Sequence, residues 1–335
     1  MTQHPIRRQL LQAGAATMLG LTAAPALARS SDSNLPDGPI NLVVPFSAGG
    51  ATDVVSRLVA QKLGDRIQRT VVVENFAGGG GAIGAAKVAR AVPDGNTLLM
   101  GTIATHVINP LSMGQKLSYV AQKDFTPVSL VVTVPNVLLV NNSVKANSVQ
   151  ELIALIKAHP SQYSYGSSGV GTPPHLSGEL LKSMEGLQMA HVPYKGGGPA
   201  MTDLIAGHIP ILFDVLSGAA SHIRARSVKA LAVTTSERVS SFPDLPTMAE
   251  SGVPGYETWT WNAVFGPAGM PRPMVDKLSS ALHDVISQPD VQVQLKALSA
   301  TPVGSTPDAL AELVDSETRK WRAVIQSIGG LSKDG

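Results

Sequence analysis

The sequence predicts an α/β protein built from two lobes that extended segments connect. Three observations predict this class. Apolar strand-like segments alternate with amphipathic helix-like segments along the chain. The apolar run at 128–140 is broken only by Thr133, Pro135 and Asn136, and a run of this kind can pass from one domain to another. Two strand–turn–helix segments with glycine-rich turns occur in different halves of the chain. We expect a mostly parallel, doubly wound sheet in each lobe, with helices on both faces.

The first 28 residues read as an export signal. Arg7 and Arg8 provide a positively charged N-terminal region, and residues 13–24 form a short apolar segment. Ala26-Leu-Ala28 has the small-x-small pattern of a signal-peptidase cleavage site. We expect cleavage after Ala28 and a periplasmic protein, and the paired arginines also resemble a twin-arginine signal. Residues 29–38 are expected to form a flexible leader.

The composition of the mature chain excludes several partners. Removing residues 1–28 takes away two of the 26 basic residues and none of the 24 acidic ones, which leaves 24 of each. This balance argues against nucleic acid or an anionic membrane surface as the main partner. The chain has no cysteine, so it has no disulfide, no lipid-modified cysteine and no thiolate metal site. With 44% hydrophobic and 15% charged residues it can bury a substantial core, and we expect a monomer.

The elements follow from local patterns. Before the long apolar run, strands are expected at 40–44, 70–73 and 97–100. One helix is expected to start at 53, between the first two strands, and another to end near 91, between the second and the third. The alternation then restarts, with helices at 149–159, 173–184, 199–206 and 218–224 and strands at 163–165, 189–192, 209–213 and 228–233. A strand at 258–265 and helices at 273–298, broken near Pro289, and 307–328 close the chain. We divide it into a first lobe (39–133 and 240–335) and a second lobe (134–239).

The first strand–turn–helix segment predicts an anion-facing turn. Leu42, Val43 and Val44 form a buried strand, and a helical stripe begins after Asp53. The turn residues between them are small, so backbone N–H groups stay open at a helix N-terminus, which suits a carboxylate or phosphate. The candidate ligand residues here are Phe46, Ser47, Ala48, Gly49, Gly50 and Asp53. A well-capped turn without a ligand has the same pattern.

The second segment, Ser164-Tyr-Gly-Ser-Ser-Gly-Val-Gly-Thr-Pro-Pro-His175, has the same form. It too should present open N–H groups, and both turns lie at the carboxyl ends of strands, where α/β sheets bind ligands. Two helix ends that face each other across a cleft would hold an anion without Arg or Lys. The candidates here are Ser167, Gly169, Gly171, Thr172 and His175.

Several candidates also have a structural interpretation. Asp53 in the first helical turn satisfies helix N–H groups, and this interpretation is favoured over the alternative that Asp53 orients the turn, or a ligand amine or hydroxyl. His175 alone on a helix is more often a packing or surface residue. Asp214, at the end of a strand, either accepts from a ligand or caps the next helix, and Tyr194 lies in a loop of the same edge.

The sequence contains no recognisable motif for catalysis or for binding a cofactor. Gly79-x-Gly81-x-x-Gly84 matches a dinucleotide pattern, but no acidic residue stands near Leu99, about 20 positions further on, so no nucleotide is expected. There is no Gly-x-Ser-x-Gly, no Gly-Lys-Ser/Thr loop and no local metal-ligand motif among the histidines. We therefore assign no catalytic residue, no metal and no cofactor.

Several motifs in order resemble the receptors of tripartite tricarboxylate transporters, the Bug family of periplasmic solute-binding proteins. They are Pro39-Ile-Asn-Leu-Val-Val-Pro-Phe46 with Gly49-Gly50 and Asp53, Val73-Glu-Asn75, Asp94-Gly95, Tyr165-Gly-Ser-Ser-Gly-Val-Gly171 with His175-Leu176, His191-Val-Pro-Tyr-Lys-Gly196, Ala230-Leu-Ala-Val-Thr234, Pro243-Asp-Leu-Pro-Thr247, and the segment from Trp261 to Pro267. The resemblance covers 39–329. The chain departs from the family at Phe76-Ala77, where an Arg-Pro-like pair is usual, and at Ser47-Ala48, where a proline is common.

This resemblance implies a two-lobed, flytrap-like type II periplasmic binding protein with extended hinge crossovers. Members hold a ligand carboxylate with backbone N–H groups and ordered waters at two loops, which correspond here to 46–53 and 167–175. The implied ligand is a dicarboxylate, tricarboxylate, acidic amino acid or aromatic acid, and the implied partners are membrane permease subunits. Two alternatives remain: an exported α/β enzyme acting on a carboxylic acid, and a solute sensor for a membrane signalling partner.

Overall fold

A computed structural model describes Leu35 and residues 38–327. The predicted signal peptide and most of the predicted leader lie outside this part of the chain. The strands are β1 (Ile40–Val44), β2 (Val71–Asn75), β3 (Thr97–Thr102), β4 (Phe125–Val140), β5 (Ser164–Ser167), β6 (Ala190–Pro193), β7 (Ile211–Val215), β8 (Lys229–Val233), β9 (Trp259–Pro267) and β10 (Thr301–Pro302).

Helices alternate with these strands. The α-helices are α1 (Ala51–Ile67), α2 (Ala82–Ala89), α3 (Asn109–Met113), α4 (Val149–Ala158), α5 (Pro173–Glu185), α6 (Gly197–Ala206), α7 (Leu216–Arg224), α8 (Arg272–Ser287), α9 (Pro289–Ala297) and α10 (Pro307–Ser327). Short turns of other helix types are η1 (Gly79–Gly81), η2 (Ala104–Ile108, π-helical), η3 (Gly114–Lys116) and η4 (Pro160–Gln162). The predicted break at Pro289 and the predicted start at Pro307 are confirmed, because proline fits the first turn of a helix and not its interior.

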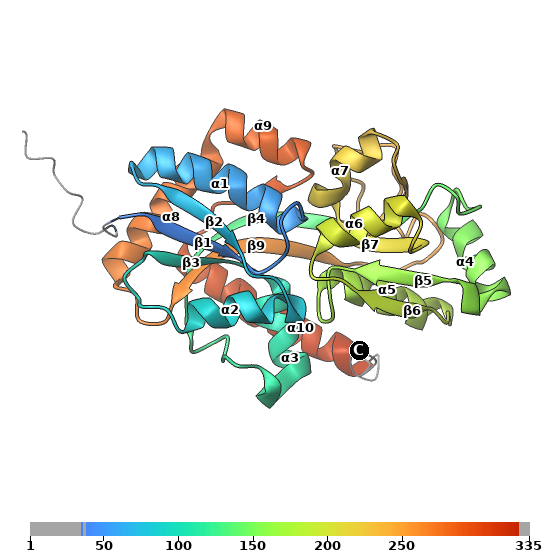
Figure 1. Ribbon diagram of the computed structural model, residues 1–335, viewed down its shortest axis with the longest axis horizontal. Coiled ribbons are helices and arrows are strands. Elements are labelled where there is room, and N and C mark those ends of the chain that lie inside the picture. The colour runs from blue at the N-terminus through green and yellow to red at the C-terminus, as the bar shows by residue number, and fades with distance from the viewer. Residues whose placement is uncertain (1–34, 36–37, 328–335) are drawn as a thin grey trace, which may run out of the picture. The chain divides into compact units, whose positions relative to one another are not determined.

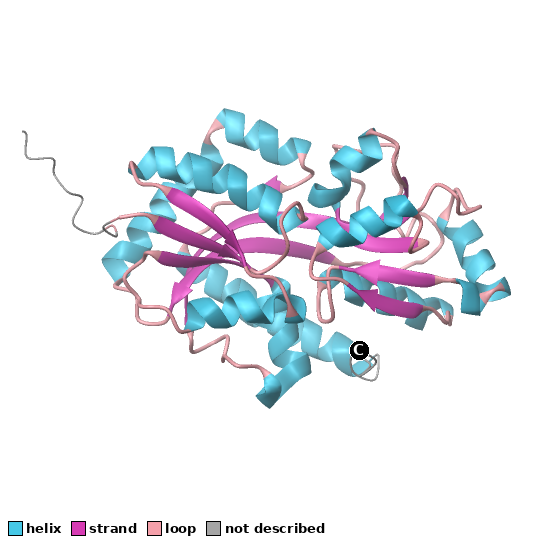
Figure 2. Ribbon diagram, in the orientation of Figure 1, coloured by secondary structure: helices cyan, strands magenta, loops and turns pink. Residues whose placement is uncertain are grey.

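The described strands form one continuous sheet in the order β2-β1-β3-β9-β4-β7-β5-β6, and β8 and β10 also pair with β4. Figure 2 shows this path with helices on either side. The strand β4 is the element that joins the two halves: up to Pro135 it pairs with β9, and from Asn136 onward it pairs with β7 and β8. We call the part with β1, β2, β3, β9 and β10 the first lobe, and the part with β5 to β8 the second lobe. The predicted two-lobed α/β class is confirmed.

The predicted mostly parallel sheet is wrong. The pairs β1–β2, β1–β3, β5–β6 and β5–β7 are parallel, but every pairing of β4 and β9 is antiparallel, so the sheet is mixed. Local patterns do not show direction, because β4 and β9 are long connecting strands rather than parts of strand–helix–strand units.

Each lobe buries apolar side chains on both faces of its sheet. In the first lobe, α1 and α8 pack on one face around Val55 and Leu282, and α2 and α10 pack on the other around Ala85 and Trp321. In the second lobe, α4 and α5 cover one face, and α6 and α7 cover the other. Figure 1 shows these layers, with the turns after β1 and β5 at the region where the lobes meet. Among the described residues, no helix is long and apolar enough to span a bilayer.

Candidate ligand-binding site

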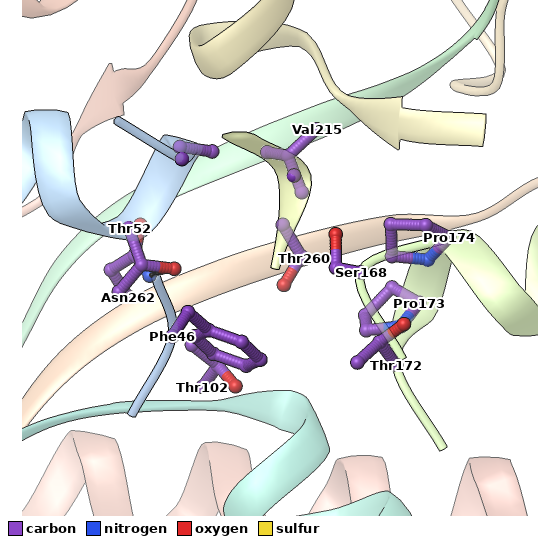
Figure 3. A pocket seen from close by; sticks show the side chains of 13 residues that line it. Phe46, Thr52, Thr102, Ser168, Thr172, Pro173, Pro174, Val215, Thr260 and Asn262 are labelled. Carbon is purple, nitrogen blue, oxygen red and sulfur yellow. Dashed lines mark hydrogen bonds between the residues drawn. The ribbon is translucent and has the colours of Figure 1, made fainter. Parts of the chain in front are cut away.

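A small pocket lies where the lobes meet, between the first loop (residues 45–50, after β1) and the second loop (residues 168–172, after β5) (Figure 3). Its volume is about 30 Å³. The residues that line it come from both lobes: Phe46, Gly50, Ala51, Thr52, Thr102, Ser168, Thr172, Pro173, Pro174, Gly197, Val215, Thr260 and Asn262. None of these thirteen has a charged side chain, so any anion held here must be bound by backbone N–H groups, hydroxyls and the Asn262 amide.

The first loop is held in place by the buried carboxylate of Asp53. Its Oδ2 accepts hydrogen bonds from Gly49 N and Arg57 Nε, each 2.9 Å long, and its Oδ1 accepts from Asn75 Nδ2 at 2.9 Å and lies 2.9 Å from Arg57 Nη2. Asn75 Nδ2 also donates to Phe46 O at 3.0 Å. Burial opposes ionisation, but the hydrogen bonds from Arg57, Gly49 and Asn75 and the charge of Arg57 outweigh it, so the pKa of Asp53 lies below its usual value. Asp53 caps no N–H group of α1 in these contacts, so it orients the turn, which was the less favoured interpretation.

The N-terminus of α1 supplies open donors to the pocket. Gly50 is the N-cap and has no side chain to cap the helix, and Gly49 turns the chain with a positive φ of 78°. Among the described residues, none accepts a hydrogen bond from the N–H of Ala51 or Thr52. Both residues line the pocket, so two donors and the positive end of the helix dipole face it. This agrees with the expected geometry of the first loop.

The second loop differs from its expected geometry, because most of its N–H groups are used internally. Gly169 N donates to Ser167 Oγ, Gly171 N to His175 Nδ1, and Thr172 N to Gly169 O. The first two positions of α5 are Pro173 and Pro174, which have no N–H. Of the loop residues that line the pocket, only Ser168 keeps an N–H without an acceptor among the described residues. The expected symmetric pair of donor-rich helix ends is therefore wrong at the α5 end.

Two of the predicted residues instead form a buried cluster behind the second loop. Ser167 Oγ lies 2.7 Å from His191 Nε2, and the rings of His175 and His191 stack with centroids 4.2 Å apart. The sequence motifs indicate no catalytic nucleophile–base pair. The distance between Ser167 Oγ and His191 Nε2 is nevertheless within the range found in such pairs. Ser167 is completely buried, and its hydroxyl also contacts the backbone of Gly169. The pair therefore braces the loop, and no substrate reaches it in this conformation.

The buried histidines predict acid sensitivity. Burial lowers the pKa of His175 to about 4 and that of His106 and His191 to about 3. Between these values and the ordinary value of about 6.5 the unfolded chain binds protons that the folded protein does not, so stability falls as the pH drops below about 6.5. Each histidine contributes at most about 1.4 kcal/mol per pH unit.

Two buried acids among the described residues oppose this slope. Burial raises the pKa of Asp214 to about 7, so between about 4 and 7 the folded protein binds the proton of this group more tightly. Burial also raises the pKa of Glu317, which acts in the same direction. Three histidines outweigh the two acids, and we expect the melting temperature to fall from pH 7 to pH 5. His191→Gln should flatten the slope. A melting temperature that stays constant or rises toward pH 5 would contradict this balance.

The remaining predicted residues lie around the pocket without lining it. Tyr194 donates its hydroxyl to Asp203 Oδ2 at 2.7 Å, away from the pocket. Ala48, Gly49 and Asp214 line a second cavity of about 370 Å³ between the first loop, α6 and α7. Asp214 Oδ1 accepts from Val215 N at 2.8 Å and lies 3.5 Å from Ser168 Oγ. A ligand contact of any of the thirteen predicted site residues stays a prediction.

Glycines let the two lobes approach closely. Ser47 N donates to Lys195 O across the boundary at 3.1 Å. A Cβ at Gly196 would collide with Ser47 Oγ, and one at Gly80 would collide with the carbonyl oxygen of Val170. The structure therefore has the lobes in contact.

Of the thirteen lining residues, only Phe46, Gly50 and Thr172 were predicted ligand residues. Five others lie outside both predicted loops: Thr102, Gly197, Val215, Thr260 and Asn262. They lie on β3, β7, β9 and the first turn of α6, so they form the walls between the two loops. Thr102 Oγ1 is buried and has no hydrogen-bond partner among the described residues. The available signal was weak: a hydroxyl or amide in an otherwise apolar strand, as in Trp-Thr-Trp-Asn-Ala-Val.

The comparison with known families decides the identity of this architecture. A model of the family described as "Tripartite tricarboxylate transporter family receptor" matches residues 55–330. The chain belongs to this receptor family. The predicted membership of the Bug proteins is confirmed, and the family is one of periplasmic solute-binding receptors that work with a transporter.

Relatives of this receptor family match nearly the full length. The protein of the tcbD–tcbE intergenic region of Pseudomonas sp. strain P51 is 37% identical over 321 residues, 96% of this chain and 94% of that protein. BugT of Bordetella pertussis strain Tohama I is 35% identical over 312 residues, 93% of this chain and 95% of BugT.

Solved structures of similar receptors confirm the type II fold. The Rpa4515 protein of R. palustris, solved with adipate, has a TM-score of 0.85 at 36% identity and covers 88% of this chain and 98% of its own. The periplasmic binding protein BugD has the same values. MatC from Rhodopseudomonas palustris, solved with bound malate, has a TM-score of 0.83 at 34% identity and covers 87% of this chain and 100% of its own.

Proposed function

We propose that the mature protein is a periplasmic receptor that binds a small carboxylate between its lobes and delivers it to the permease subunits of a tripartite tricarboxylate transporter. The observation that carries the proposal is the pocket with the open N–H groups of Ala51 and Thr52 and no charged side chain. Helix N-termini bind carboxylates in this way. The adipate and malate of the similar receptors support the same ligand chemistry.

Binding requires the lobes to separate. A volume of about 30 Å³ holds only one or two waters, whereas sites for small organic ligands usually have about 300 Å³ or more. The predicted lobes are residues 39–133 with 240–335 and residues 134–239, but Met248, Val253 and Tyr256 pack in the core of the second lobe. We therefore propose that the chain up to Tyr256 moves with the second lobe, and that β4 and the start of β9 act as the hinge. The ligand then shifts the equilibrium toward a closed form that the permease recognises.

The alternative from another class is an exported enzyme acting on a carboxylic acid. The Ser167–His191 pair is the only feature we find for it among the described residues, and its burial argues against it. A solute sensor would have the same site. The similar binding proteins favour export to the periplasm and no catalysis.

A thermal-shift screen of the mature protein against a panel of carboxylic acids tests the proposed function. At least one acid is expected to raise the melting temperature in a concentration-dependent way, because a ligand that binds only the folded state stabilises it. The corresponding amides, which have no negative charge, are the matched controls. Turnover of a bound acid would support the enzyme, and no shift with any acid would contradict the receptor.

A further inference from the structure

The carboxylate of Asp214 is buried near the boundary of the lobes without a basic partner. It lies near the end of β7 and is 1% exposed. Its Oδ1 accepts from Val215 N at 2.8 Å and lies 3.5 Å from Ser168 Oγ, whereas Oδ2 has no donor among the described residues. No ion pair of the described residues includes it. An ionised carboxylate has about four acceptor positions to satisfy, so this burial favours the protonated form.

The first lobe closes over this carboxylate. Ala48 and Gly49 of the first loop line the second cavity together with Asp214. Gly197 lies directly against the carboxylate, because a Cβ there would be 2.6 Å from Oδ1 and 2.9 Å from Oδ2. A Cβ at Gly50, in the first lobe, would in turn lie 3.4 Å from Gly197 N. Figure 1 shows the N-terminal end of α1 beside α6 and α7. Separation of the lobes removes the first loop from this cavity, so water then reaches Asp214.

The proton affinity of Asp214 therefore depends on the distance between the lobes. Burial raises the pKa of Asp214 to about 7 while the lobes are in contact, whereas an aspartate in water has a pKa of about 4. A proton that binds one conformation more tightly shifts the equilibrium toward that conformation as the pH falls. With these two values, the ratio of closed to open protein rises about tenfold from pH 8 to pH 6.

We infer that Asp214 is a proton-binding site coupled to closure of the lobes, which takes up one proton from the solvent at this carboxylate. The inference rests on the lobe movement proposed above and adds a pH dependence to it. Protonation also removes a negative charge next to Gly197, which lines the ligand pocket. A bound carboxylate and the proton on Asp214 therefore favour each other, because two like charges in a buried site repel.

One other ionisable group faces the same cavity. Of the residues that line it, only Asp214 and His222 carry ionisable side chains. A charged His222 would favour the ionised form of Asp214, so it opposes the inferred effect. Lys195, in the loop before α6, is exposed and lines neither cavity. The other ionisable groups on the elements around Asp214 have partners of their own: Asp53, His175, Glu179, His191, Asp203 and Arg224.

The distance between two spin labels on the ligand-free protein tests the inference. The chain has no cysteine, so Val92→Cys in the first lobe and Met184→Cys in the second supply its only thiols. Both positions are exposed, at 68% and 39%. Pulsed electron resonance is expected to show a ratio of closed to open protein about tenfold higher at pH 6 than at pH 8. A ratio that stays constant, including a single distance at both pH values, would overturn the inference.

Two variants of the labelled protein identify the responsible group. Asp214→Asn has nearly the same shape and no charge, so its closed fraction is expected to be the same at pH 6 and pH 8. His222→Gln is the matched control in the same cavity and is expected to keep the pH response of the wild type. Circular dichroism verifies that each variant is folded at both pH values. A pH response that persists in Asp214→Asn, or disappears in His222→Gln, would contradict the assignment to Asp214.

Calorimetric titration with adipate and malate, the acids of the similar receptors, counts the protons taken up on binding. Titrations at pH 6 in buffers of different ionisation enthalpy are expected to give roughly one proton more per bound acid for the wild type than for Asp214→Asn. Equal uptake in the two proteins would overturn the inference and leave the carboxylate receptor intact. If no carboxylic acid binds, the proposed function fails, and the spin-label distances still decide whether Asp214 controls closure.

Discussion

Replacing Asp53 with alanine is expected to lower the free energy of unfolding by about 2–3 kcal/mol and the affinity for a carboxylate by about a hundredfold. The buried carboxylate joins Gly49 N, Asn75 Nδ2 and the guanidinium of Arg57. Without it the N–H of Gly49 loses its acceptor, and the first loop loses the contacts that orient the open donors of Ala51 and Thr52. Chemical denaturation and calorimetric titration measure the two effects.

Arg57→Gln is the matched control for this prediction. The Arg57 side chain is 53% exposed, so its ion pair is partly screened by solvent, and Asp53 keeps its bonds to Gly49 and Asn75. The expected loss of stability is below about 1 kcal/mol. A larger effect of Arg57→Gln than of Asp53→Ala on ligand affinity would show that charge, rather than loop geometry, governs the site.

The second large effect is expected at Gly80. A Cβ here would collide with the carbonyl oxygen of Val170, on the other lobe, so Gly80→Ala should disfavour the closed form. We expect a loss of affinity of about tenfold or more, and a ligand-bound radius of gyration closer to that of the open protein in small-angle scattering.

Gly79→Ala separates closure from backbone strain. Gly79 has nearly the same positive φ, 58° against 59°, but a Cβ there meets only Ala82 Cβ at 3.4 Å. Both variants therefore carry a similar strain, and only Gly80→Ala meets the other lobe. Equal losses of affinity in the two variants would contradict a role of this contact in closure.

Local patterns predicted the elements because hydrophobic period and proline position determine them directly. The start of α10 at Pro307, the break at Pro289 and the extended run predicted at 128–140, which is part of β4 (Phe125–Val140), illustrate this. The direction of β9 and the π-helical segment Ala104–Ile108 were not predictable in this way. They depend on long-range pairing with β3 and β4 and on the packing of His106 against Phe265, with ring centroids 3.6 Å apart.

The candidate site was predictable in position and only partly in chemistry. Small residues and glycines after β1 and β5 indicated which loops meet. The sequence pattern did not show that Ser167 and His175 use up the N–H groups of Gly169 and Gly171, because these bonds depend on side-chain placement. Nor did it indicate Thr102 and Asn262, whose place at the pocket results from the mixed sheet that brings β3 beside β9.

A crystal structure of the mature protein with its tightest-binding carboxylate tests the central claim most directly. We expect the carboxylate oxygens to lie about 2.8–3.0 Å from the N–H nitrogens of Ala51 and Thr52, between the first and second loops. A carboxylate in the cavity between α6 and α7, or paired with a lysine or arginine side chain, would contradict it.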